Sequence, residues 1–187
     1  MLERVTPADA GELWTLQLAA YLVEGRRHAT FAIPPLQQTL AELTASLGAG
    51  SSVLVARLGS RLVGSVRGEV RDEDVWFLGR LMVAPDQQGR GLGSTLLAAA
   101  EASAPPATRT FRLVTGAHSV TNLPFYTHRG YREVGRGTDQ GGAPFVLLEK
   151  DRASPEKWRD PVGAGAPRVD AASDVAKNTS AAVGLIR

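Results

Sequence analysis

The spacing of apolar residues divides the chain into predicted helices and strands. Between Leu13 and Leu22 leucines and a tyrosine recur at helical intervals, which predicts an amphipathic helix. Thr6-Pro7-Ala8-Asp9 has the pattern of a helix start, with a threonine cap, a proline and an acidic residue that reaches back to the cap. The helix is expected to end near Gly25. A rigid loop is predicted at residues 33–36, because proline disfavours helix in the residue before it, and a second helix should follow up to Gly48.

Strand patterns dominate the middle of the chain. Residues 53–58 and 61–70 flank Gly59-Ser60, a two-residue hairpin signal, and Gly64 and Gly68 are expected to mark bulges. The remaining predicted elements, in order, are a strand at 75–83, a helix at 95–101, a strand at 110–115, a short helix at 119–129 and strands at 130–134 and 144–149.

This order of elements predicts an α/β fold with a mixed sheet. Hairpin-connected strands come first and strand–helix–strand crossovers follow, so helices should cover the sheet. A length of 187 residues suits one domain of about 150 residues, placed here at residues 1–150, plus a tail. Residues 151–187 are rich in Ala, Gly, Pro, Asp and Ser, which predicts a disordered or loosely docked segment.

Composition excludes several classes of protein. The chain has no cysteine, which rules out disulfides, thiolate metal sites and a cysteine nucleophile, and we expect no metal. A net charge of +2 is too small to indicate a nucleic-acid partner, although the isoelectric point is about 9.3. The N-terminus lacks the layout of a signal peptide, and no apolar run approaches the roughly 20 residues of a membrane span. We therefore expect a cytoplasmic protein with no membrane association.

Candidate chemistry is concentrated in residues 81–94, where an apolar strand end meets three glycines and then a helix-forming segment. A strand that enters a helix through such an elbow gathers unpaired backbone N–H groups at the positive end of the helix dipole. The elbow is therefore suited to bind a pyrophosphate.

Three other interpretations of this elbow are less compatible with its residues. A P-loop needs a lysine after its last glycine, but Ser94 follows Gly93. A dinucleotide fingerprint needs a third glycine where Ser94 stands and an acidic residue about 20 positions further on, which is missing. A ligand-free turn explains one or two glycines, but not three glycines together with Gln88.

The segment Gln88-Gly89-Arg90-Gly91-Leu92-Gly93 matches the Gln/Arg-x-x-Gly-x-Gly/Ala motif of the GCN5-related N-acetyltransferases. It follows a strand that ends Leu81-x-Val83-x-Pro85, and Phe125-Tyr126-x-x-x-Gly130-Tyr131 is similar to a second signature of that superfamily. The chain resembles the superfamily from about Val5 to Lys150. The resemblance implies a central, mostly antiparallel sheet that is splayed at the cofactor site and has helices on both faces.

The resemblance also implies how acetyl-CoA would bind. Pantetheine would lie in the splay as an extra strand and hydrogen-bond to the backbone of Leu81, Met82 and Val83. The pyrophosphate would be held by the backbone N–H groups of the elbow, which comprises Gln88, Gly89, Arg90, Gly91, Leu92, Gly93 and Ser94. The Arg90 side chain could add a contact to phosphate or simply face solvent.

For the transfer step, the resemblance assigns Tyr126 as the general acid that protonates the leaving thiolate. The alternative is that Tyr126 only packs beside Phe125. Asn122 or Ser119 would contact the cofactor arm, although either could instead be the helix cap.

The resemblance does not directly assign a general base for the acceptor amine, because the positions where many relatives carry a glutamate hold Phe77 and Gly79. Glu69 is the candidate, with Glu24, His118 or a water chain as substitutes. Arg80 stands within an apolar strand and needs a partner, either Glu69 or an acidic group of the acceptor.

The sequence thus predicts an N-acetyltransferase that moves an acetyl group from acetyl-CoA to a primary amine by direct attack. Its partner would be a small-molecule or protein amine acceptor, whose identity the sequence does not reveal, and a homodimer is one assembly open to it. The alternative is a non-catalytic acyl-CoA-binding sensor or interaction module on the same fold.

Overall fold

The structure is a computed structural model that describes residues 1–27, 31–48, 50–139 and 142–152. A single seven-stranded sheet runs through these residues in the order β1-β2-β3-β4-β5-β7-β6. Its strands are β1 (Leu2–Arg4), β2 (Ser51–Leu58), β3 (Arg61–Asp72), β4 (Val75–Val83), β5 (Thr110–Gly116), β6 (Arg132–Thr138) and β7 (Pro144–Asp151). All neighbours are antiparallel except β4 and β5, so the predicted mixed, mostly antiparallel sheet is confirmed.

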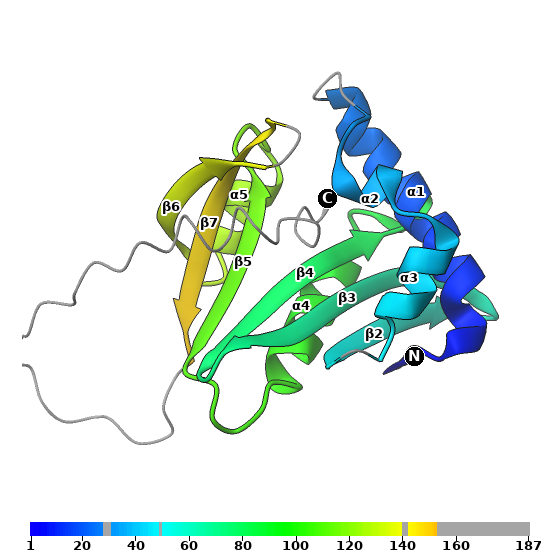
Figure 1. Cartoon of the computed structure of the whole chain (residues 1–187), viewed down its shortest axis with the longest axis horizontal. Coiled ribbons are helices and arrows are strands. Elements are labelled where there is room, and N and C mark those ends of the chain that lie inside the picture. Colours follow the sequence, from blue (N-terminus) through cyan, green and yellow to red (C-terminus); the bar gives the residue numbers. More distant parts are fainter. Residues whose placement is uncertain (28–30, 49, 140–141, 153–187) are drawn as a thin grey trace, which may run out of the picture.

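Helices cover both faces of this sheet (Figure 1). They are α1 (Ala10–Arg27), α2 (Pro34–Gln37), α3 (Leu40–Ser46), α4 (Leu92–Ala102) and α5 (Asn122–Thr127), with short 3₁₀ turns at Pro7–Asp9 and Pro85–Gln87. The first three helices lie over β2, β3 and β4, and α4 lies on the opposite side of the same strands. None of the helices within the described ranges is both long and apolar enough to cross a membrane.

The predicted start of the first helix is confirmed. Asp9 accepts hydrogen bonds from the backbone N–H of Thr6, at 2.7 Å, and from its hydroxyl, at 2.8 Å. Thr6 is extended and caps the 3₁₀ turn that leads into α1. The N-terminal end of this helical segment is therefore fixed by local sequence alone.

One expectation at the N-terminal end is wrong, and one strand there was not predicted. Pro34 and Pro35 do not form a loop but begin the short helix α2, because proline fits the first positions of a helix, where no N–H is needed. Ile33, the residue before them, is extended, as the rule for that position requires. The strand β1 was not predicted, since three residues are too few to show an alternating pattern.

Gly64 borders a bulge, as expected, because Val63 is an extra residue of β3 opposite Ala56 and Arg57, whereas Gly68 is regularly paired and marks none. Both glycines also allow close packing. A Cβ on Gly68 would lie 2.3 Å from the indole of Trp76, and one on Gly64 would lie 2.8 Å from the side chain of Leu96. The Trp76 indole N–H donates to the carbonyl oxygen of Ala100 at 3.0 Å, which ties β4 to α4. The missing side chains therefore let α4 and an indole approach the sheet closely.

The last strand extends beyond the expected end of the domain. β7 continues to Asp151, which is opposite Thr110 on β5, and the backbone N–H of Arg152 donates to the carbonyl oxygen of Arg109 at 2.7 Å. The expected tail from residue 153 onwards lies outside the described residues.

Candidate active site

The sheet opens between its two parallel strands. β4 and β5 are paired only over Val75–Leu78 and Thr110–Leu113. Beyond this point β4 continues to Val83 beside β3, while β5 continues to Gly116 beside β7, and the two strands diverge (Figure 1). Each strand therefore has one edge with no strand partner, to which an extended molecule could hydrogen-bond.

The β4 side of this splay consists of Leu81, Met82 and Val83. The three residues are at most 2% exposed and belong to the hydrophobic core. On the side away from β3 this segment has no strand partner, so its backbone N–H and carbonyl groups there could pair with an extended ligand. This is the chemistry that the sequence predicts for the pantetheine contact.

The glycine-rich elbow follows directly on the splayed end of β4. The Gln88 side chain donates to the carbonyl oxygen of Val83 at 3.2 Å, which holds the loop against the strand end. Gly89 has a φ of 76° and Gly91 a φ of 81°. Both lie in the left-handed region, where a side chain would be strained, so the path of this loop requires glycine.

Backbone donors gather where the elbow becomes α4. Hydrogen bonding of the helix begins with the N–H groups of Ser94 and Thr95, which both donate to the carbonyl oxygen of Gly91. The N–H groups of Leu92 and Gly93 precede these bonds and belong to the unpaired donors of a helix N-terminus. Apart from the glycine itself and its two neighbours in the chain, no described atom lies within 4 Å of the position that a Cβ on Gly89 or Gly91 would occupy. The elbow can therefore receive an anionic group such as a pyrophosphate.

Two arginines lie at this end of α4. Arg90 is exposed on the elbow itself. Arg129, just after α5, contacts the hydroxyl of Ser94, donates to the carbonyl oxygen of Phe125 at 2.7 Å and lies 3.7 Å from the Phe125 ring centre. Arg129 thus joins the helix that carries Tyr126 to the first turn of α4. Arg129 was not predicted from the sequence, because it occupies one of the unspecified positions between Tyr126 and Gly130 in the second signature.

The Tyr126 side chain is 3% exposed and lies in a cluster of aromatic rings. Its ring makes edge-to-face contacts with Phe125, at 5.1 Å between ring centres, and with Tyr131, at 5.7 Å. Burial raises the pKa of Tyr126 above its ordinary value, and the nearby Tyr21 raises it further. The phenol therefore keeps its proton at neutral pH.

Tyr21 connects this cluster to an irregularity in β4. Between the pairs Ser65–Met82 and Arg67–Gly79, β3 has one residue and β4 has two, which is a bulge. Arg80 lies in this bulge with a φ of 51°, a conformation that costs a residue with a side chain about 1–2 kcal/mol. The bulge turns Arg80 toward the face covered by α1, where its guanidinium lies 5.9 Å from the centre of the Tyr21 ring.

Ser119 and Asn122 are both buried at the start of α5. The Ser119 hydroxyl accepts a hydrogen bond from the backbone N–H of Asn122 at 3.2 Å, which is a capping contact. The Asn122 amide donates to the hydroxyl of Thr115 on β5 at 3.3 Å. The pair thus fixes α5 against β5, beside the splay.

The candidate base Glu69 is held by two arginines. One of its oxygens lies 2.7 Å from the Nε of Arg71 and 2.5 Å from an Nη of that residue, and the other lies 3.7 Å from the Nε of Arg67. Both carboxylate oxygens of Glu69 therefore contact arginine side chains. Among the substitutes, His118 is exposed, and the side chain of Glu24 lies outside the described part of the chain.

Comparison with known proteins identifies a similar domain in part of the chain. A family model described as an acetyltransferase (GNAT) domain matches residues 49–133. This range contains the splayed part of β4, the elbow, α4 and Tyr126. No curated protein matches the sequence significantly.

Solved structures share the fold at low sequence identity. The aminoglycoside 6'-N-acetyltransferase from Enterococcus faecium is 16% identical, with a TM-score of 0.64 over 83% of this chain and 99% of that one. The PaiA N-acetyltransferase from Thermoplasma acidophilum, solved in complex with coenzyme A, is also 16% identical, with a TM-score of 0.64 over 81% and 98%. The ribosomal-protein-S18-alanine N-acetyltransferase from Escherichia coli is 15% identical, with a TM-score of 0.64 over 85% and 99%.

These structures establish the GNAT fold for the described residues, and the family model covers the segment that carries the elbow and the second signature. The described residues therefore have the fold of GNAT acetyltransferases, and residues 49–133 match a GNAT acetyltransferase domain.

Proposed function

We propose that the protein transfers an acetyl group from acetyl-CoA to a primary amine by direct attack. The observation that carries this proposal is the glycine-rich elbow at the end of an unpaired strand edge. Such an edge can hold the amides of pantetheine, and the N-terminus of α4 can hold the pyrophosphate next to it. The PaiA relative, which has the same fold, was solved with coenzyme A bound.

The transfer itself needs few protein groups. The amine lone pair attacks the thioester carbonyl carbon, and the C–S bond then breaks as the tetrahedral intermediate collapses. We assign Tyr126 as the donor that gives its phenolic proton to the departing thiolate. The burial that raises the pKa of this phenol also raises that of a thiol released in the same apolar surroundings, so the two groups stay comparably acidic.

We assign the loss of the amine proton to water rather than to Glu69. The amine must be neutral before it attacks, and this deprotonation can precede the chemical step. Both oxygens of the Glu69 carboxylate are engaged by Arg71 and Arg67 rather than directed at an acceptor amine. The rate should therefore rise with pH as more of the acceptor amine becomes neutral, without a step that belongs to a protein carboxylate.

The proposal is tested by incubating the protein with acetyl-CoA and a panel of primary amines while free thiol is measured. Amine-dependent thiol release, with the acetylated amine identified by mass spectrometry, is the expected result. Saturable binding of acetyl-CoA without turnover on any amine would contradict the enzyme and favour an acyl-CoA sensor. Absence of acetyl-CoA binding would contradict both.

A further inference from the structure

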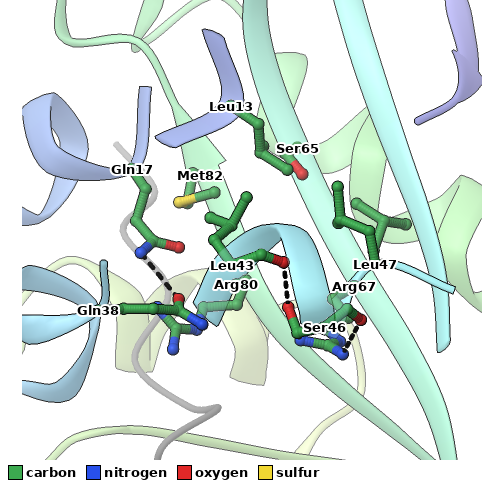
Figure 2. Close-up of a pocket in the computed structure, with 11 residues that line it drawn as sticks. Leu13, Gln17, Gln38, Leu43, Ser46, Leu47, Ser65, Arg67, Arg80 and Met82 are labelled. Atoms are coloured by element: carbon green, nitrogen blue, oxygen red, sulfur yellow. Dashed lines mark hydrogen bonds between the residues drawn. The ribbon is translucent and has the colours of Figure 1, made fainter. Parts of the chain in front are cut away.

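The two halves of the sheet pack with different helices. The first half, β1 to β4, carries α1 to α4, whereas α5 packs against β5 in the second half, β5 to β7. Figure 2 shows polar contacts that fasten the first half together. The Gln17 amide donates to the Gln38 side chain at 3.0 Å. Arg67 donates to the carbonyl oxygen of Ser46 at 2.8 Å. The cavity that these residues line has a volume of about 20 Å³, room for about one water molecule, so this half is closely packed up to the splay.

Tyr126 belongs to the second half, so its place relative to the donor site depends on contacts across the splay. Side chains join α4 to the second half near both ends of the helix. Toward the C-terminal end, Glu101 accepts a hydrogen bond from the hydroxyl of Tyr131 at 2.9 Å. In the first turn, the hydroxyl of Ser94 is contacted by the guanidinium of Arg129. The contact at Ser94 lies at the elbow, and Arg129 follows Tyr126 by three residues.

The Arg129 side chain forms a bridge between α4 and α5. One terminal nitrogen of its guanidinium contacts the Ser94 hydroxyl, and the other donates to the carbonyl oxygen of Phe125 at 2.7 Å. The guanidinium lies 3.7 Å from the centre of the Phe125 ring, and that ring meets the Tyr126 ring edge-on. Phe125 and Tyr126 also share a peptide bond. Arg129 therefore fixes both the backbone and the aromatic ring next to Tyr126.

The contacts of Arg129 within the described residues include no carboxylate. They are made with a hydroxyl, a carbonyl oxygen and a ring. The guanidinium lies at the N-terminal end of α4, where the helix dipole is positive and a cation is unfavourable unless an anion lies nearby. A pyrophosphate in the elbow would supply that anion. Binding of the donor would therefore stabilise the bridge.

The charge of Arg129 also acts on the phenol of Tyr126. Burial raises the pKa of Tyr126, the nearby Tyr21 raises it further, and Arg129 opposes the rise. A nearby cation stabilises the phenolate that forms when a tyrosine gives up its proton. The guanidinium thus favours the step assigned to Tyr126.

We propose that Arg129 is a positioning residue, which holds Tyr126 beside the thioester by bridging α4 and α5 across the splay. The inference rests on the proposed acetyl transfer with Tyr126 as the acid. In that step the phenolic O–H bond breaks while the S–H bond of coenzyme A forms, so oxygen and sulfur must lie within hydrogen-bond reach. A displacement of about 1 Å can cost about 10²-fold in rate. A bridge to the turn that would hold the pyrophosphate limits such a displacement.

Two variants cut the bridge from opposite ends. The assay measures kcat at saturating acetyl-CoA, with the full-length protein and the best amine of the panel. Arg129→Gln should lower kcat by about 10- to 100-fold. Ser94→Ala keeps the backbone N–H groups of the elbow and should lower kcat by about three- to tenfold, the usual effect of one hydrogen bond. Arg132→Gln is the control for charge and should keep the wild-type kcat, because Arg132 is exposed on β6 and pairs with Asp151.

A double-mutant cycle separates positioning from a general loss of structure. The variant Tyr126→Phe has no acid to position, so adding Arg129→Gln to it should change kcat by less than about twofold. A residue that only supported the fold would lower kcat by the same factor in both backgrounds. Ser94→Ala cuts the same bridge with a smaller change, and the same cycle applies to it should Arg129→Gln fail to fold.

The outcomes distinguish this proposal from the proposed function. A wild-type kcat for Arg129→Gln, or equal factors in the two backgrounds, would overturn the positioning role and leave the acetyltransferase standing. Calorimetry with acetyl-CoA adds a third outcome. Weaker binding with an unchanged kcat would limit Arg129 to the phosphate site and would also overturn the positioning role. If the wild-type protein acetylates no amine, the proposed function fails and the positioning role fails with it.

Discussion

In the proposed reaction, the hydroxyl group of Tyr126 gives its proton to the leaving thiolate, a step that a protein that only binds acetyl-CoA would not need. Its ring is buried among Phe125, Tyr131 and the core, and would pack in the same way without its oxygen. Tyr131 is equally buried, but its hydroxyl donates to Glu101 at 2.9 Å. The two tyrosines therefore differ in the partner of the hydroxyl, which makes them a matched pair for mutagenesis.

We predict that Tyr126→Phe lowers kcat by about 10²–10⁴-fold, the usual contribution of a general acid, and leaves the affinity for acetyl-CoA nearly unchanged. Steady-state kinetics and calorimetry measure the two effects. Tyr131→Phe should lower stability, because it leaves Glu101 with one partner fewer, but should leave kcat within a few-fold of wild type. Equal rates for Tyr126→Phe and wild type would remove Tyr126 as the acid.

The prediction for Gly91 concerns the binding of acetyl-CoA. Gly91→Asp should abolish measurable acetyl-CoA binding, because it adds a negative side chain in the space where the elbow would hold the pyrophosphate. Gly59→Asp is the control, since Gly59 also has a positive φ, of 62°, and open space around it, but lies in the hairpin between β2 and β3. Both variants carry backbone strain, so binding lost in both would contradict the pyrophosphate assignment.

At the scale of elements, the sequence predicted what depends on local chemistry and missed what depends on pairing. The capping box at Thr6, the hairpin at Gly59 and the strand Val75–Val83 all follow from short-range patterns, and all three are confirmed. The bulge at Arg80 depends on the register between β3 and β4, and the role of Tyr21 on how α1 packs over β4. Neither the bulge nor this role of Tyr21 can be recognised from the local sequence.

The close packing of strands and helices gives a prediction for Gly68. Gly68→Ala should lower the free energy of unfolding by about 1–3 kcal/mol, because its Cβ would force the Trp76 ring away from α4. Gly135→Ala is the control, as a Cβ there would lie 3.9 Å from Leu147, at ordinary contact distance. Chemical unfolding monitored by tryptophan fluorescence measures both, and equal stabilities would show that Trp76 can move at little cost.

For the whole molecule, the end of β7 defines the smallest chain that should fold. Truncation after Arg152 is expected to retain acetyl-CoA binding and a wild-type melting temperature. Truncation after Lys150 should lower the melting temperature, because it removes the Asp151 pairing with Thr110 and the Arg152 contact with Arg109. Thermal melts of both chains test this, and a lower melting temperature already after Arg152 would show that later residues stabilise the domain.

The stability of the whole molecule should also depend on alkaline pH. Burial raises the pKa of Tyr126 and of Tyr131, so both stay protonated in the folded state when an exposed tyrosine would ionise. Their contribution is complete below about pH 10 and is lost above it, by about 1.4 kcal/mol per pH unit for each tyrosine. Urea unfolding between pH 9 and 11 measures this slope, which Tyr126→Phe should reduce. An identical slope for Tyr126→Phe and wild type would contradict the burial of the Tyr126 hydroxyl.

The splay has a thermodynamic consequence for the protein as a whole. Strand pairing between β4 and β5 joins the two halves of the sheet over four residue pairs only, Val75–Leu78 with Thr110–Leu113. An acetyl-CoA molecule that fills the gap between β4 and β5 binds the folded state and not the unfolded one. By mass action, acetyl-CoA at about 100 times its Kd would add about 2.7 kcal/mol to the free energy of unfolding. Through the splay, the free energy of unfolding would thus depend on the concentration of acetyl-CoA. The lifetime of the protein would then depend on the supply of its own substrate.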